Sequence, residues 1–274
     1  NGVAGYYSMS DEYPKEISRY SNEHEIIYID PSSVRLGSTF YFELLTHELQ
    51  HAIHWAQDPN EETWINEGLS EVAKNITGYN LSFVDNFQEN PQTSLINWPY
   101  DDSDSLPNYG ASSLFIEYLS QYFGGYNNLK VLTESQMDGI DGVNNFLVES
   151  GYEQSFYDVF SDWVIANYLD PLKIYPYYYN NLDLTVGSTT LSINEQHSAT
   201  LPQFSADYIE LEAPSEPFVL HFNGTETNRI MPYANQHGDY CWWGNKGDSI
   251  DSTLTTTVDL SNVASANLQF KNRV

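Results

Sequence analysis

The chain has 274 residues, of which 38 are acidic and 10 are basic, so its formal net charge is −28. A protein of this charge is repelled by nucleic acid and by anionic lipid, which excludes nucleic acid as an expected partner. The single cysteine, Cys241, excludes a disulfide within the chain and a zinc site built from cysteines. No apolar run approaches the roughly 20 residues of a membrane helix, so we expect no membrane insertion.

The N-terminal part of the chain contains a short strand followed by a long helix. The segment EIIYID (25–30) predicts a short buried strand. Residues 38–57 then have the apolar spacing of a helix. The apolar positions that define this helix are Phe42, Leu45, Leu49 and Ile53.

A second helix is predicted over 58–76. Asp58 is its expected N-cap, Pro59 occupies the first helical position and Glu61 lies three residues after the cap. Further helices follow after loops rich in Gly, Asn and Asp. They are predicted over 109–123, 142–150 and 155–169.

The C-terminal part of the chain has a different pattern. Short, β-branched, alternating runs bounded by Gly, Pro, Asn and Ser predict a β-sandwich. These runs lie at 182–193, 206–213, 217–222, 252–260 and 266–270. The expected fold class is therefore α+β, with a mainly helical domain over 1–178 and an all-β sandwich domain over 179–274.

Residues 46–55 read THELQHAIHW, in which His47 and His51 are four residues apart and share one face of the predicted helix. Two imidazoles with stems about 6 Å apart can converge on one ion. Glu48 can reach a metal-bound water without being a ligand. His54 lies about 10 Å from His47 along the helix axis and cannot share that ion, so we expect it to pack or hydrogen-bond nearby. A surface helix with charged residues is the alternative interpretation.

The third predicted ligand is Glu67 in WINEGLSE. His51 and Glu67 lie eight residues on either side of Pro59, so a chain reversal there brings them to the same height on two antiparallel helices. Two histidines and a carboxylate, with a fourth position open to water, are the ligands expected of a catalytic zinc ion. Glu71 is predicted to accept the free ring N–H of a ligand histidine, with a solvated helix carboxylate as the alternative.

HELQH followed by WINEGLSE resembles the gluzincin metallopeptidases, whose HExxH is followed on the next helix by a glutamate in an Asn-Glu-Gly or Asn-Glu-Ala sequence. HELQHAIHW, WINEGLSEVA, NYGASSLFIEYLSQYFG and FSDWVIAN are similar to secreted bacterial peptidases of the hyicolysin and immune inhibitor A kind, over most of residues 5–170. The resemblance implies a zincin-like catalytic domain in a secreted, extracellular protein. It also implies that His47, His51 and Glu67 bind zinc and that Glu48 is the general base.

The expected activity is hydrolysis of polypeptides by a zinc-dependent endopeptidase. Zinc can lower the pKa of its bound water to about 7, and Glu48 can accept the proton and pass it to the leaving amine. Tyr109 in NYGASS is the candidate oxyanion donor because related gluzincins resemble this chain in placing a Tyr before a Gly-Ala helix; packing is the alternative. Related aminopeptidases bind the substrate amine with a Gly-x-Met-Glu-Asn loop, which this sequence lacks, and this favours an endopeptidase.

Two acidic turns are candidate calcium sites, because hard cations prefer clustered carboxylate oxygens. These turns contain Asp101, Asp102 and Asp104 in DDSDS, and Asp138 and Asp141 in MDGIDG. Neither turn has the spacing of an EF-hand, and solvated loops are the alternative.

The segment that begins YCWWG looks like the opening of the jelly-roll modules that accompany immune inhibitor A-like peptidases. This resemblance implies a jelly-roll-like β-domain, truncated at Val274, with a candidate calcium turn at Asp248 and Asp251. Trp242 and Trp243 are candidates for stacking on a sugar ring, with core or inter-domain packing as the alternative. The expected partners are a polypeptide substrate and, through the β-domain, a carbohydrate or a cell surface.

Two other classes of function are consistent with the sequence. One is an extracellular binding or adhesion protein whose zinc site is structural or vestigial. The other is a processed fragment that folds only with its missing neighbours. The fragment hypothesis is motivated by the absence of an initiator Met and by the small amount of predicted β-structure before the metal helix.

Overall fold

The computed structural model describes residues 3–99, 104–192, 195–212, 217–225 and 253–269. The chain divides into two compact units, Asn1–Asn223 and Gly224–Val274. Every helix and strand named below belongs to the first unit. Within the described residues, no helix combines the length and the apolar character needed to cross a membrane.

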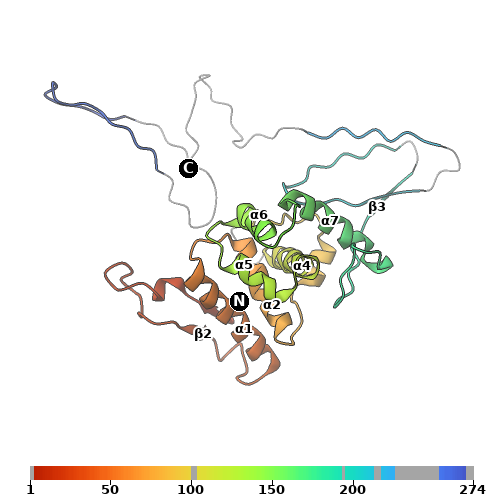
Figure 1. The fold of residues 1–274 in the computed structure, drawn as a ribbon, viewed down its shortest axis with the longest axis horizontal. Coiled ribbons are helices and arrows are strands. Elements are labelled where there is room, and N and C mark those ends of the chain that lie inside the picture. Colours follow the sequence, from red (N-terminus) through yellow and green to blue (C-terminus); the bar gives the residue numbers. More distant parts are fainter. Residues whose placement is uncertain (1–2, 100–103, 193–194, 213–216, 226–252, 270–274) are drawn as a thin grey trace. The chain divides into compact units, whose positions relative to one another are not determined.

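The described part of the first unit is mainly helical (Figure 1). Its α-helices are α1 (Thr39–Gln57), α2 (Thr63–Ile76), α3 (Val84–Glu89), α4 (Leu106–Tyr122), α5 (Leu129–Thr133), α6 (Gly139–Glu149) and α7 (Phe156–Leu169). Short 3₁₀ helices lie at Met9–Asp11, Tyr126–Asn128 and Asp170–Leu172. The predicted helices are present, and their ends agree within three residues except at the start of α2, which begins five residues later than predicted. Helices α3 and α5 are too short to give a clear periodic signal.

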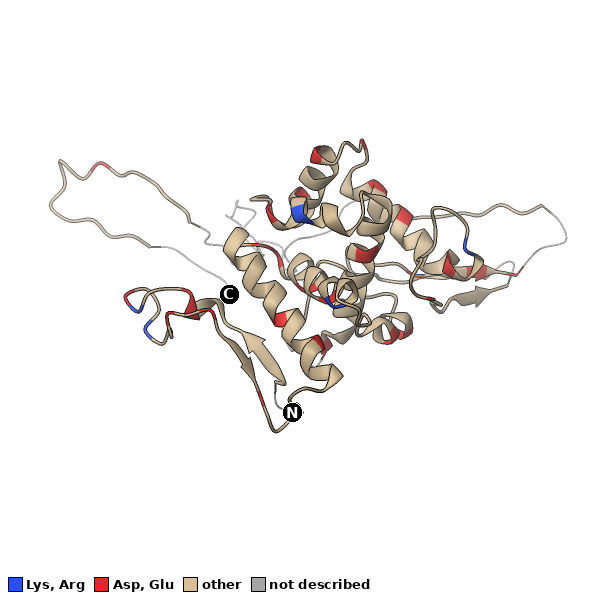
Figure 2. Ribbon diagram, turned by 60° about the horizontal axis from the view of Figure 1, so that its bottom comes forward, with Lys and Arg blue, Asp and Glu red and all other residues tan. Residues whose placement is uncertain are grey.

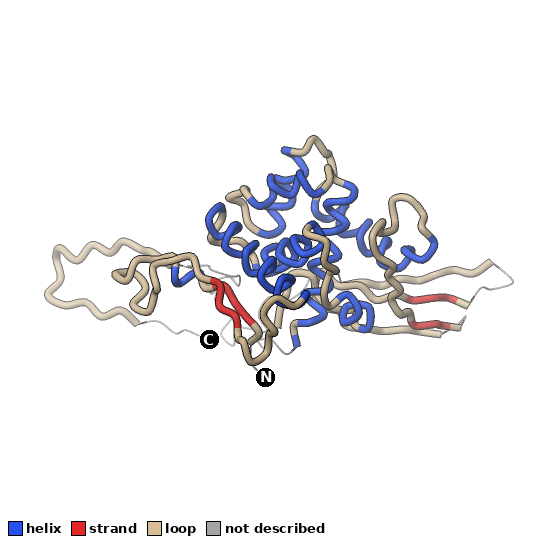
Figure 3. Tube along the Cα trace, turned by 90° about the horizontal axis from the view of Figure 1, so that it is seen from below, coloured by secondary structure: helices blue, strands red, loops and turns tan. Residues whose placement is uncertain are grey.

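The strands of the described residues form two small pairs, which Figure 3 shows beside the much larger helical part. β1 (Gly5–Tyr7) runs antiparallel to β2 (Ile27–Ile29), and β3 (Thr189–Leu191) runs parallel to β4 (Ile209–Leu211). β2 lies within the strand predicted over 25–30. β1 and β2 both contact α1, so this small sheet lies against the helix that carries HELQH.

The predicted β-sandwich is wrong. The described residues of 179–274 contain only the strands β3 and β4. The runs at 217–222 and 253–260 form no strand, and their side chains are exposed, with Phe222 90% accessible. An alternating pattern shows that a segment is compatible with a strand, but a sheet also needs a neighbouring strand for its backbone hydrogen bonds. The fold class is mainly helical, and the domain boundary at 178 stays a prediction.

Helix α4 lies in the centre of the helical core and packs against α2, α3 and α7. Its residues Leu114 and Ile116 are buried on different faces of the helix. Gly68 of α2 permits the close approach of these two helices. A Cβ atom at Gly68 would lie 2.7 Å from Cγ1 of Ile116 and 2.9 Å from the backbone oxygen of Ser112. The glycine that follows Glu67 therefore positions α2 against the core.

The boundary between α1 and α2 differs from the prediction. Helix α1 begins after Ser38, whose side chain accepts a hydrogen bond from the backbone N–H of Tyr41 at 3.2 Å. The helix ends at Asp58, whose N–H donates to the backbone oxygen of His54 at 2.7 Å. Asp58 is therefore the C-cap of α1, and its predicted role as the N-cap of the next helix is wrong. Helix α2 begins at Thr63.

Helix α1 packs through a polar face. The side chains of Phe42, Leu49 and Ile53 are 44%, 50% and 53% exposed, whereas Glu48 and His54 are buried. The apolar spacing correctly predicted the helix, but of its four apolar positions only Leu45 is half-buried, and the fully buried side chains of α1 are polar. The buried side chains of α1 are ionisable, so the groups that they contact determine their charge and reactivity.

Candidate metal centre

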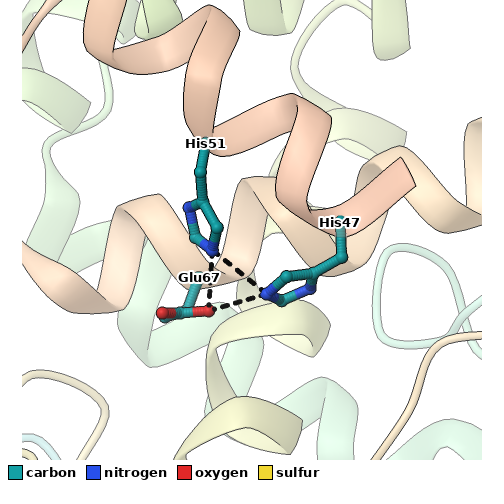
Figure 4. Close-up of side chains that lie close together, drawn as sticks. All are labelled: His47, His51 and Glu67. Carbon is teal, nitrogen blue, oxygen red and sulfur yellow. Dashed lines mark hydrogen bonds and ion pairs between the residues drawn. The ribbon is translucent and has the colours of Figure 1, made fainter. Parts of the chain in front are cut away.

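His47 and His51 on α1 and Glu67 on α2 point toward one another (Figure 4). We call these three residues the first ligand group. Helices α1 and α2 run antiparallel, because the earlier residue His47 contacts Glu71 while the later residue His54 contacts Asn66. The structure thus brings together the three residues that the sequence predicted as zinc ligands.

The donor atoms of the first ligand group form a nearly equilateral triangle. Nε2 of His47 lies 3.1 Å from Nε2 of His51 and 3.1 Å from Oε2 of Glu67. The third edge, from Nε2 of His51 to Oε2 of Glu67, is 3.5 Å. Zinc bonds of about 2.0–2.1 Å at tetrahedral angles place neighbouring ligand atoms about 3.3 Å apart. The triangle therefore has the size of one face of a zinc coordination tetrahedron.

Glu71 hydrogen-bonds one of these histidines. Its Oε1 lies 3.1 Å from Nδ1 of His47, and its Oε2 accepts hydrogen bonds from Lys74 at 2.9 Å and from the backbone N–H of Ser82 at 2.8 Å. A neutral His47 that donates from Nδ1 has its lone pair on Nε2, the atom in the donor triangle. Burial opposes the charge of Glu71, but His47 and Lys74 outweigh this effect and lower its pKa.

Asn66, the residue before Glu67, orients two histidines at once. Its Oδ1 lies 3.0 Å from Nδ1 of His51 and 3.1 Å from Nδ1 of His54. An amide oxygen only accepts hydrogen bonds, so both imidazoles donate from Nδ1 and keep the lone pair on Nε2. Sequence reasoning missed this role of Asn66. The available signal was its position beside Glu67 in the Asn-Glu-Gly sequence.

The electrostatics of the first ligand group favour a positive charge. Burial opposes the protonation of His47, but hydrogen bonds with Glu67 and Glu71 outweigh it and raise the pKa of His47 to about 10. Burial also opposes the charge of Glu67, but His51 and His47 outweigh it and lower the pKa of Glu67 to about 2. A proton is therefore held among these atoms at neutral pH, and a metal ion must displace it.

Glu48 is buried next to His47 on α1. Its Oε2 accepts a hydrogen bond of 2.8 Å from the backbone N–H of Tyr7 in β1. This contact fixes the carboxylate, and the second carboxylate oxygen can still accept a proton. The sequence contains no signal for the contact, because the donor is a backbone group distant in the chain.

The ring of Tyr109, near the start of α4, lies beside the first ligand group. Its centroid is 6.4 Å from that of the His47 ring. The Tyr109 ring also contacts Trp98 and Phe83, with centroid distances of 4.8 and 5.4 Å. Tyr109 is close to the candidate metal centre and is packed among aromatic side chains, so both of its predicted roles stay predictions.

Most of the predicted calcium ligands fall on residues that the structure does not describe. Asp101, Asp102, Asp248 and Asp251 lie outside the described residues, as do Trp242 and Trp243. Asp104 is exposed just before α4. Asp138 is the N-cap residue of α6 and Asp141 lies in its first turn, where carboxylates stabilise a helix N-terminus.

Acidic side chains are distributed over the helices and loops, with few Lys and Arg among them (Figure 2). Such a charge distribution attracts cations. No family model matches the chain, and no curated protein matches it. The fold and the site define a mainly helical protein with a zinc-sized donor triangle on an antiparallel helix pair.

Proposed function

We propose that the chain is a secreted zinc-dependent endopeptidase of the gluzincin type that hydrolyses polypeptides. The observation that carries this proposal is the donor triangle of His47, His51 and Glu67, with edges of 3.1, 3.1 and 3.5 Å, next to the buried Glu48. The three ligand side chains retain 13–17% of their accessible surface. Three protein ligands with access to solvent leave one coordination position open to water, as catalytic zinc requires.

The residues around the triangle have separate tasks in this mechanism. A zinc ion held by the first ligand group would activate a water molecule and polarise the scissile carbonyl. Glu48 accepts the proton of the attacking water and passes it to the leaving amine. Glu71 and Asn66 keep the ligand histidines oriented. Tyr109 is the candidate donor to the developing oxyanion.

The test compares Glu48→Gln with the wild type in zinc content and in casein hydrolysis. Because glutamine cannot accept the proton, we expect hydrolysis to fall by roughly 10²–10⁴-fold while the zinc content is unchanged. Glu149→Gln, at an exposed position at the end of α6, is the matched control and should behave like the wild type. Full activity of Glu48→Gln would exclude the mechanism.

A second candidate function is an extracellular binding or adhesion protein with a structural or vestigial zinc site. The 2.8 Å hydrogen bond from the N–H of Tyr7 to Glu48 favours it, because this contact already engages one oxygen of the carboxylate that the peptidase mechanism uses as general base. This candidate predicts zinc binding without turnover. Chelator-sensitive cleavage of a peptide library would exclude it.

A further inference from the structure

A second group of metal-ligating side chains lies where α1 meets α2. His54 is in the last turn of α1, Asp58 ends this helix and Glu61 lies in the turn before α2. One donor atom from each residue lies within 4.8 Å of the other two. All three residues are more than nine-tenths buried, with exposed fractions of 1%, 4% and 7%. We call these residues the second ligand group.

Each side chain of the second ligand group is held in place by one of its polar atoms. Nδ1 of His54 lies 3.1 Å from Oδ1 of Asn66. Oδ1 of Asp58 and Oε1 of Glu61 accept hydrogen bonds from backbone N–H groups at 3.1 and 2.7 Å. These contacts outside the group restrain the three side chains.

The other polar atom of each side chain has no hydrogen-bond partner among the described residues. These atoms are Nε2 of His54, Oδ2 of Asp58 and Oε2 of Glu61. Buried polar atoms are normally hydrogen-bonded, and an unpaired buried carboxylate oxygen is especially costly. Three such atoms in one small group indicate a missing positive partner.

We propose that His54, Asp58 and Glu61 bind a second divalent transition-metal ion, zinc by preference, that fixes the connection between α1 and α2. Two carboxylates neutralise a dication, so the bound ion and its ligands can be buried without net charge. An imidazole ligand selects against Ca²⁺ and Mg²⁺, which prefer oxygen. The three donor atoms, which lie within 4.8 Å of one another, can approach the spacing of about 3.3 Å between zinc ligands by small side-chain rotations.

Asn66 connects the two ligand groups. Its Oδ1 contacts Nδ1 of both His51 and His54, at 3.0 and 3.1 Å. An ion bound to His54 restrains Asn66 and, through it, the imidazole of His51. The second ion thus acts as a structural support for the first ligand group, and its binding does not require that the protein be a peptidase.

The test is a titration of the full chain, freed of metal with a chelator, with Co²⁺ and then with Zn²⁺. The visible absorption of Co²⁺ and the heat of Zn²⁺ binding should both saturate at about two equivalents in the wild type, one for each ligand group. Glu61→Gln should saturate at one equivalent through the first ligand group, and Glu67→Gln at one equivalent through the second. Circular dichroism establishes that both variants are folded.

Saturation of the wild type at one equivalent that is lost in Glu67→Gln, or two equivalents in Glu61→Gln, would overturn the proposal. If Glu61→Gln does not fold, Glu67→Gln decides the question, because it must still bind one equivalent of Co²⁺. Stabilisation of Glu67→Gln by Ca²⁺ in place of Co²⁺ would overturn the assignment to a transition metal. None of these measurements depends on hydrolysis, so a failure of the peptidase proposal is distinguishable from a failure of this one.

Discussion

The two ends of the α1–α2 pair carry ligand groups that differ in charge and in access to solvent. The first group combines two imidazoles with one carboxylate and is partly exposed, whereas the second combines one imidazole with two carboxylates and is buried. A dication keeps a net positive charge beside one carboxylate but is neutralised by two. A zinc ion in the first group would therefore keep the positive charge that the proposed hydrolysis needs, whereas the second group is suited to an ion that stabilises the fold.

The largest expected effect is a loss of zinc affinity at the first ligand group that leaves the second group unchanged. Glu67→Gln removes the only carboxylate of the first group, so its zinc affinity should fall by more than about 100-fold, beyond the effect typical of residues behind the ligands. Hydrolysis should be lost in parallel, while the second group keeps its affinity. Competition with a chromophoric chelator measures the zinc affinity of each group, and an equal loss of affinity at both groups would contradict this prediction.

Asn66→Ala should weaken both groups, because Asn66 contacts a histidine of each. We expect a loss of about 10–100-fold in zinc affinity at each site. Glu71→Gln is the internal control, since Glu71 contacts only His47 of the ligand histidines, and it should weaken the first group alone. An Asn66→Ala variant that changed one affinity and left the other intact would show that the groups are independent.

The pH should change the zinc affinity of the first group by about tenfold per unit. His47, with its pKa raised to about 10, is protonated at neutral pH, so zinc binding releases one proton and becomes tighter as the pH rises from about 6 to 8. Calorimetry in buffers of different ionisation enthalpy counts this proton. An affinity that does not depend on pH would contradict the assignment.

In the second group, the protonation of Glu61 should make the folding stability of the metal-free protein depend on pH. Burial raises the pKa of Glu61 to about 8 from its usual 4.5, so the metal-free folded state holds a proton that the unfolded chain releases. This contribution to the free energy of unfolding is complete below about pH 4.5 and is lost as the pH rises to about 8, by at most about 1.4 kcal/mol per unit. Urea unfolding of the metal-free wild type and of Glu61→Gln at several pH values measures this effect. The free energy of unfolding should fall with rising pH more steeply in the wild type, and an equal pH dependence in the two proteins would exclude the prediction.

The first ligand group could be predicted because the residues that identify it are close together in the sequence. A four-residue spacing places His47 and His51 on one helix face in any fold, and Glu67 followed from a chain reversal near Pro59. The contact of Tyr7 with Glu48 could not be predicted in this way. It depends on a backbone group of a small sheet that lies against α1.

The second ligand group was missed for a different reason. Asp58 and Glu61 fit a helix-start pattern, which explained both residues without any tertiary contact. In the structure, α1 instead ends at Gln57 with Asp58 as its C-cap, and Glu61 accepts a hydrogen bond from the distant Gly139. A local pattern that is satisfied by itself can therefore conceal a site that is assembled from several segments.

Composition and short-range spacing are sufficient to predict the main helices, the shared face of His47 and His51 and the excess of negative charge, because each depends on residues within a few turns or on none in particular. Only the folded chain shows that Glu48 and His54 of α1 are buried, that the runs at 217–222 and 253–260 form no strand, and that His54 lies close to two carboxylates. These features could not be predicted because the cost of burying a polar group, and the pairing of a strand, depend on partners from distant parts of the chain.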